Sequence, residues 1–236
     1  MKTAASRIIA GMSALAALLL PGTTWAFPAS PCPVATPACK TVVLSGFNSA
    51  TGNLLSGMAV FQWSGTTLTN VSADDTEASS VLLTGLFFSL KDTLGNEVAL
   101  TSGTAVLPAG SDVWNSGVVE AVQPAGGVVG GEWAYRGKLL SDPDNTTGFN
   151  QGISSTGLDL FGNATFGGAN LDGPIAVNGL QYGMLSSGHN PATQPLPGGD
   201  DYVKDSTRFT LTYAAGLSLS QAGAIGSTSP SSTESP

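Results

Sequence analysis

Alternation of apolar and polar residues is clearest in residues 207–213. Phe209, Leu211 and Tyr213 occupy every second position there, and polar residues fill the positions between them. Because successive side chains of a β-strand point to opposite faces, this pattern predicts a half-buried strand with one face in the core. The chain has no repeat of fixed period, so the pattern does not indicate a solenoid or a propeller.

Residues 132–140 show the same period of two. Trp133 and Tyr135 fall on one face, which we expect to pack, and Glu132 falls on the other face, which we expect to meet water. A second strand is predicted in residues 114–123, and we expect it to lie beside the first because only a glycine-rich connection separates them.

Five further stretches complete the predicted all-β fold. Residues 79–90 are apolar on both faces, as in a central strand, and Gly85 with its β-branched and aromatic neighbours disfavours a helix. The other predicted strands cover 41–45, 54–63 and two brief stretches on either side of Ser102–Gly103. We therefore predict an antiparallel β-sandwich of short strands that spans residues 41–219.

The two ends of the chain differ from this central domain. Residues 1–26 have a basic start, an apolar run and small residues at Thr24 and Ala26, which predicts a cleaved secretory signal peptide. The apolar run is shorter than the ~20 residues of a spanning helix, so we expect no membrane span in the mature chain. Residues 27–40 form a Pro-rich arm, and residues 220–236 predict a disordered tail rich in Ser, Thr and Pro.

Charge and composition exclude two classes of partner. The chain carries a formal net charge of −8, and removal of Lys2 and Arg7 with the signal peptide would take it to −10. An acidic surface repels nucleic acid and anionic lipid, so we expect neither as a partner. Charged residues make up only 10% of the chain, which suits an extracellular β domain with hydroxyl and amide side chains on its exposed faces.

Cys32 and Cys39 are the two cysteines of the chain. In an oxidising compartment such a pair predicts a disulfide across a short, Pro-containing loop. Metal-binding thiols are the alternative, but the one histidine, His189, lies far along the chain. We expect His189 to be a surface residue of a loop and not a catalytic one.

Aromatic and acidic residues supply the candidate chemistry. Secreted β-sandwiches often act on polysaccharides, through pairs of carboxylates or through aromatic rings that stack on sugars. The candidate acid is Glu132 with Glu120 or Asp159 as its partner, although no pattern defines the separation of two carboxylates. The candidate sugar-stacking residues are Trp63, Trp114, Trp133 and Tyr135, with burial in the core as the alternative for most of them.

An oxygen-rich turn offers a candidate calcium site. Asp142, Asp144 and Asn145 have a spacing that partly matches a calcium loop, but the later bidentate Glu is lacking. Turns favour Asp and Asn for their own geometry, so a purely structural turn is the alternative. We expect no other cofactor.

Several segments between residues 79 and 219 resemble a known family. They are, in order, LTGLFFSL, GGEWAYR, GISSTGLDLFG, ANLDGP, NGLQYGMLSSGHNPAT and TRFTLTY. In this order they resemble the body of bacterial exosortase-dependent (PEP-CTERM) surface proteins. The resemblance implies export, sorting by the exosortase machinery and display at the surface or in the extracellular matrix. The family's sorting signal is absent after Leu219, and we expect a truncated or shifted reading frame near Gln221.

These observations predict a secreted, non-enzymatic surface or extracellular-matrix protein of a Gram-negative bacterium, located in the periplasm, outside the cell or at the cell surface. The alternative is a carbohydrate-binding module that uses exposed aromatics to bind extracellular polysaccharide. A secreted glycoside hydrolase is a third, weaker interpretation, because it needs a carboxylate pair that the sequence does not define.

Overall fold

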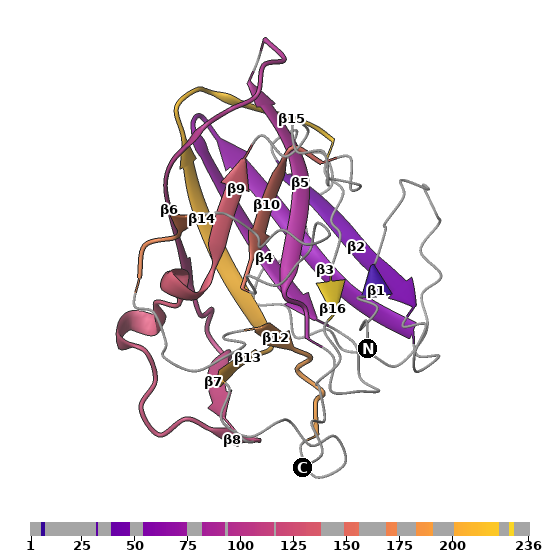
Figure 1. Ribbon diagram of the computed structural model, residues 1–236, viewed down its shortest axis with the longest axis vertical. Helices are drawn as coiled ribbons and strands as arrows, with labels where there is room; N and C mark the ends of the chain where they lie inside the picture. Colours follow the sequence, from indigo (N-terminus) through magenta and orange to yellow (C-terminus); the bar gives the residue numbers. More distant parts are fainter. Residues whose placement is uncertain are drawn as a thin grey trace, which may run out of the picture.

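Two five-stranded β-sheets face each other and enclose the hydrophobic core (Figure 1). The computed structural model describes residues 6–7, 32, 39–47, 54–74, 82–92, 94–115, 117–137, 149–155, 169–173, 183–190, 201–221 and 227–228. Within these ranges the regular structure is almost entirely β-strand, and the predicted all-β antiparallel sandwich is confirmed. No helix in these ranges is long and apolar enough to cross a membrane.

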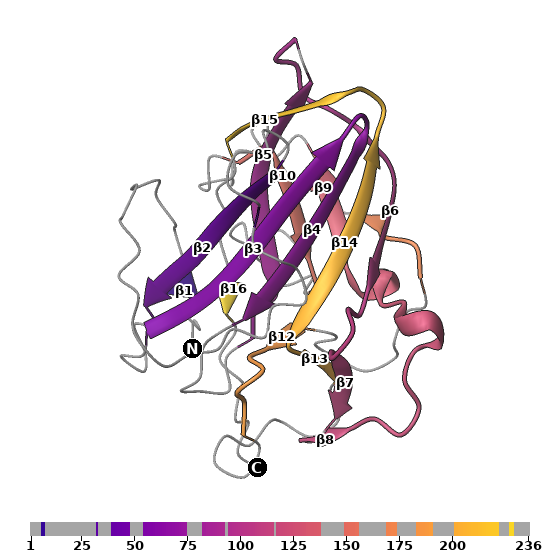
Figure 2. The ribbon, with the colours of Figure 1, turned by 180° about the vertical axis from the view of Figure 1, so that it is seen from behind.

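The first sheet has the order β2-β3-β4-β14-β6, and all its pairs are antiparallel (Figure 2). Its strands are β2 (Cys39–Phe47), β3 (Leu54–Ser64), β4 (Thr67–Asp74), β6 (Leu100–Val106) and β14 (Ser206–Tyr213). β6 runs straight through Ser102–Gly103, so the expectation of two brief strands there is wrong. Gly103 does not turn the chain: a Cβ atom there would lie 2.8 Å from Leu171 and 2.9 Å from Leu211, so the glycine allows close packing.

The second sheet has the order β11-β9-β10-β5-β15. Its strands are β5 (Gly85–Asp92), β9 (Ala134–Gly137), β10 (Gln151–Ser154), β11 (Ala169–Asn170) and β15 (Leu217–Gln221). β5 has neighbours on both sides, and the consecutive side chains of Phe87 and Phe88 are both buried. The prediction of a central strand that is buried on both faces is therefore confirmed.

A smaller sheet with the order β12-β13-β7-β8 lies at one end of the sandwich (Figure 1). Its strands are β7 (Asp112–Asn115), β8 (Val118–Val119), β12 (Gly183–Leu185) and β13 (Asp201–Lys204), and β12 and β13 run parallel. Residues 114–123 thus form part of the β7–β8 hairpin, which turns at Gly117 with φ +81°, and not one strand beside β9. The predicted pairing is wrong because the chain changes sheets through two short 3-10 turns, η1 (Ala125–Gly127) and η2 (Gly130–Glu132).

Two more short strands, β1 (Ser6–Arg7) and β16 (Ser227–Thr228), pair with each other. β1 belongs to the predicted signal peptide. Cleavage after Ala26 would therefore remove one strand of this pair and leave the three larger sheets intact.

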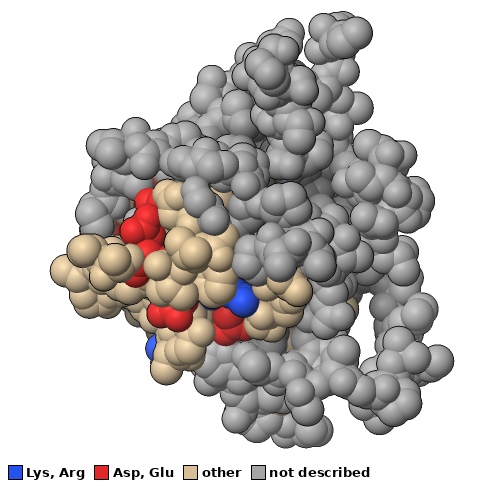
Figure 3. Space-filling view, turned by 90° about the horizontal axis from the view of Figure 1, so that it is seen from below, with Lys and Arg blue, Asp and Glu red and all other residues tan. Residues whose placement is uncertain are grey.

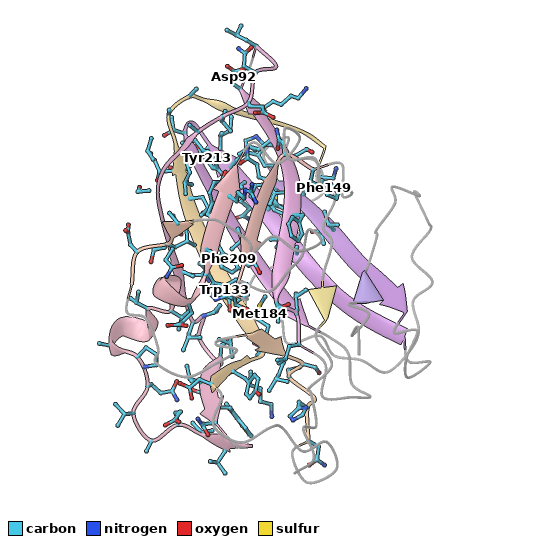
Figure 4. The ribbon with its side chains drawn as sticks, viewed as in Figure 1. Asp92, Trp133, Phe149, Met184, Phe209 and Tyr213 are labelled. Atoms are coloured by element: carbon cyan, nitrogen blue, oxygen red, sulfur yellow. A yellow bond between two sulfur atoms is a disulfide. The ribbon has the colours of Figure 1, made fainter. Side chains whose placement is uncertain are left out.

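The alternation predicted for β14 is confirmed by the core. Phe209, Leu211 and Tyr213 are all buried between the two large sheets. Phe209 meets Trp133 edge to face, with 4.9 Å between ring centroids, and Figure 4 shows both rings inside the sandwich. Aromatic pairs of this geometry stabilise a core by about 0.5–1.5 kcal/mol beyond the area that they bury.

One side of the sandwich is closed by residues 169–173. β11 pairs with β9 of the second sheet, and the Leu171 N–H donates to the Trp133 carbonyl at 2.9 Å. The next residue turns to the first sheet, where the Asp172 N–H donates to the Gly103 carbonyl at 2.7 Å. This segment therefore ties the edge of one sheet to the edge of the other.

Candidate functional site

Two of the four candidate sugar-stacking residues are buried in the core, and a third packs against it. Trp133 and Tyr135 are 0% and 7% exposed, and Trp63 packs against the same buried cluster. Stacking on a sugar needs an open ring face, so Trp133 and Tyr135 cannot serve as platforms in this structure, and Trp63 is partly buried. The alternation directs Trp63 and Tyr135 to the inner faces of β3 and β9, and Trp133, directly before β9, is buried with Tyr135.

Trp114 on β7 reaches the surface in part. Its neighbour across the strand pair is Tyr202, and the Nζ atom of Lys204, two residues further along β13, lies 4.3 Å from the Trp114 ring centroid. A cation over an indole face is attracted by the electrons of the ring. One face of the Trp114 ring therefore already carries a contact.

Glu132 lies inside the fold and not on a solvated face. Its side chain is 6% exposed and belongs to η2, whereas β9 begins only at Ala134. The expectation of a solvated Glu132 is wrong because the 3-10 turn breaks the two-residue period before the strand begins. Burial, and then the negative charge of Asp201, raise the pKa of Glu132 to about 7.

Asp201 is the acidic partner that the fold supplies to Glu132. It begins β13, and the Asn115 Nδ2 atom donates a 2.7 Å hydrogen bond to its Oδ1 atom. The sequence pointed instead to Glu120 or Asp159; Asp159 lies outside the described residues. A carboxyl group that keeps its proton near neutral pH can act as an acid, but Glu132 offers little surface to a ligand. Figure 3 shows acidic areas with a smaller basic area beside them at this end of the molecule.

His189 lies in a loop after β12, as expected, but it is buried and not a surface residue. Its N–H donates to the Ser186 carbonyl at 3.1 Å, and its side chain is 3% exposed. The Nε2 atom has no hydrogen-bond partner. Burial, and then the positive charge of Lys204, lower the pKa of His189, so the imidazole is neutral at physiological pH.

An open cleft of about 430 Å³ lies on the closed side of the sandwich, between β6 and β11. Thr101, Ser102, Asn170 and Asp172 contribute polar groups to its walls. Tyr135 also lines it, and this phenol donates to the Gln151 side-chain oxygen. The cleft thus combines apolar strand surface with hydroxyl and amide groups, and its size lies in the range of small-ligand sites.

Cys32 and Cys39 are joined by a disulfide with 5.5 Å between their Cα atoms. Cys39 is the first residue of β2, so the bond links Cys32 to the edge of the first sheet. The candidate calcium residues Asp142, Asp144 and Asn145 lie outside the described residues. Within the part of the chain that the structure describes, no three His, Cys, Asp or Glu side chains are grouped so that they could hold a metal ion.

Comparisons of the chain with protein-family models, with curated proteins and with solved structures give no match. The resemblance to exosortase-dependent surface proteins therefore rests on the sequence segments alone.

Proposed function

We propose that the chain is an exported, non-enzymatic β-sandwich protein of the cell surface or extracellular matrix of a Gram-negative bacterium. The observation that carries this proposal is the disulfide between Cys32 and Cys39. Disulfides persist in oxidising compartments and are rare in the cytosol, where thiols are kept reduced. The signal peptide predicted in residues 1–26 and the resemblance to exosortase-dependent proteins support the same location.

The arrangement of the acidic residues favours a non-enzymatic role over a glycoside hydrolase. Glycosidases place two carboxyl groups on either side of a bond that the substrate presents to them. Here the carboxyl groups of Glu132 and Asp201 interact, but Glu132 is buried and Asp201 is held by Asn115. The protein acts through its outer surface, with no bond made or broken.

The cleft between β6 and β11 favours a second candidate function, the binding of a small neutral carbohydrate. Its hydroxyl and amide groups can exchange hydrogen bonds with a sugar without aromatic stacking. Titration of the labelled protein with neutral oligosaccharides, followed by NMR, tests this candidate. Changes in chemical shift that are confined to Thr101, Asn170 and their neighbours would support carbohydrate binding in this cleft. An unchanged spectrum would exclude it.

Localisation tests the leading proposal. The full chain is expressed with a C-terminal epitope in a Gram-negative host that encodes an exosortase, and the cells are fractionated. We expect protein in the periplasm, envelope or medium, with Phe27 at its N-terminus and with both cysteines protected from thiol labelling until reductant is added. The Cys32→Ser, Cys39→Ser double variant provides the unlabelled control. Full-length protein in the cytoplasm with reactive thiols would contradict the proposal.

A further inference from the structure

The outer face of the first sheet carries a grid of uncharged polar side chains. The strands β3, β4, β14 and β6 each contribute two of them, and the registers align these into two rows. One row consists of Ser64, Thr67, Thr212 and Ser102, and the other of Gln62, Thr69, Thr210 and Thr104. All eight are partly or fully exposed.

The residues between the two rows face the opposite way. Leu68 and Leu211 are buried in the core, and Trp63 packs against it. On β6 the intervening residue is Gly103, which lies close to Leu171 and Leu211. The core therefore holds the backbone beneath the grid in place, and at the edge of the grid the Thr104 hydroxyl donates to the Asp172 carbonyl at 3.1 Å.

Strand geometry sets this spacing in two directions. Residues two apart along a strand are separated by about 6.7 Å, and neighbouring strands lie about 4.8 Å apart. In a sheet that twists by about 22° per strand, the two outer strands of four are rotated by about 33° from the mean strand direction. The grid extends over only two residues of each strand, so this rotation moves its corner groups by about 2 Å. The corner groups on the two outer strands therefore lie about 2 Å above or below the mean plane of the grid.

We infer that this grid of seven hydroxyl groups and the Gln62 amide is an ice-binding surface. A hydroxyl gains little from a soluble partner, because it exchanges one hydrogen bond with water for another. A grid of such groups gains affinity when its partner repeats at the same spacing, because all the contacts then form together. Oxygen atoms on the prism face of ice repeat in two directions at close to the strand spacing and close to the two-residue repeat. Threonine also presents a methyl group beside each hydroxyl, which suits a lattice with open hexagonal channels.

Charge supports ice over other partners. The chain has a net charge of −8, yet none of the eight side chains of the grid is ionisable. Arg208, two residues before Thr210 on β14, marks the boundary of the uncharged area. The outer face presents no aromatic platform within the grid, since Trp63 points inward, so crystalline polysaccharides that bind through stacking fit it less well.

The test uses the full chain, purified with its disulfide intact, in an assay of ice recrystallisation. We expect the protein to slow the growth of ice crystals and to enter a slowly growing ice phase. Thr69→Lys and Thr210→Lys should each raise the protein concentration that is needed to slow ice growth by at least about tenfold. This change corresponds to about 1.4 kcal/mol of binding free energy. Leu94→Lys adds the same charge at an 85% exposed position in the turn after β5 and should have no effect.

Thermal unfolding checks that the lysine variants fold like the parent protein. Ice growth unaffected by the parent protein would overturn the inference. Equal losses of ice-growth inhibition in Thr69→Lys and Leu94→Lys would also overturn the inference, because the added charge alone would then explain the effect. Retention on crystalline cellulose or chitin without any effect on ice would assign the surface to polysaccharide instead.

Discussion

Asn150 provides the sharpest test of how the sandwich is held together. Its side chain is fully buried and makes two hydrogen bonds to the backbone of Leu90 on β5. The Leu90 N–H donates to Oδ1 at 2.9 Å, and Nδ2 donates to the Leu90 carbonyl at 2.8 Å. The regular pairing of β10 with β5 begins only at Gln151 and Phe88, so the side chain of Asn150 continues the ladder as a backbone unit would.

The substitution Asn150→Ala would leave both backbone groups of Leu90 without their partners inside the protein. Each buried, unsatisfied group costs about 1–3 kcal/mol, so for the two groups of Leu90 we expect a loss of about 2–6 kcal/mol in the free energy of unfolding. Domains of this kind are stable by about 5–15 kcal/mol, so the loss is a large fraction of the total. Urea unfolding measures it directly.

Two further variants make the test specific. Asn170→Ala removes an exposed amide from β11 and should change the free energy of unfolding by less than about 0.5 kcal/mol. Asn150→Asp keeps the acceptor for the Leu90 N–H but places a buried carboxylate against the Leu90 carbonyl. Its stability should recover as the pH falls, because the protonated acid regains a donor. A loss below about 1 kcal/mol in Asn150→Ala would refute the reasoning.

Three other predictions concern a glycine, an acid and the disulfide. Gly130→Ala places a methyl group on the Asp172 carbonyl oxygen and should cost about 1–3 kcal/mol in urea unfolding, whereas at Gly216 a methyl group meets only the Gly65 carbonyl oxygen at an ordinary 3.9 Å and Gly216→Ala should be nearly neutral. Because burial and a neighbouring charge raise the pKa of Glu132 from 4.5 to about 7, the protonated acid stabilises the fold most below pH 4.5, and this contribution is lost as the pH rises to 7. The stability of the parent protein relative to Glu132→Gln should fall across that range in thermal unfolding, and parallel curves would contradict this. Reduction of the Cys32–Cys39 bond should lower the free energy of unfolding by at most about 2–3 kcal/mol, because the loop is short, and a larger loss would mean that the bond also holds the first sheet.

Local alternation was a sound guide to which faces are buried. The inward residues of β14 and the double burial of β5 could be predicted, because a two-residue period depends only on neighbours along the chain. The two-residue period does not hold at Glu132, because the 3-10 turn Gly130–Glu132 interrupts the strand pattern there. No pattern of apolar residues in the sequence marks this turn. The predicted break between two brief strands at Ser102–Gly103 is absent, because Gly103 allows close packing within the continuous strand β6.

Contacts between distant segments could not be predicted from the pattern. Asp201 meets Glu132 only because β13 joins the small end sheet, and no local feature of either segment shows this. The hydroxyl rows have the same origin. The Thr-Leu-Thr triplets at 67–69 and 210–212 are visible in the sequence, but their alignment depends on the register between β4 and β14.

The segment of residues 169–173 has a consequence for how copies of the protein meet. Strand edges with unpaired N–H and C=O groups are where β proteins join edge to edge and form aggregates. On this side of the sandwich Leu171 and Asp172 already use backbone groups of Trp133 and Gly103 for their own hydrogen bonds. Another chain must displace this segment before it can bond to the carbonyl groups of Trp133 or Gly103, so the segment protects these backbone groups from intermolecular pairing.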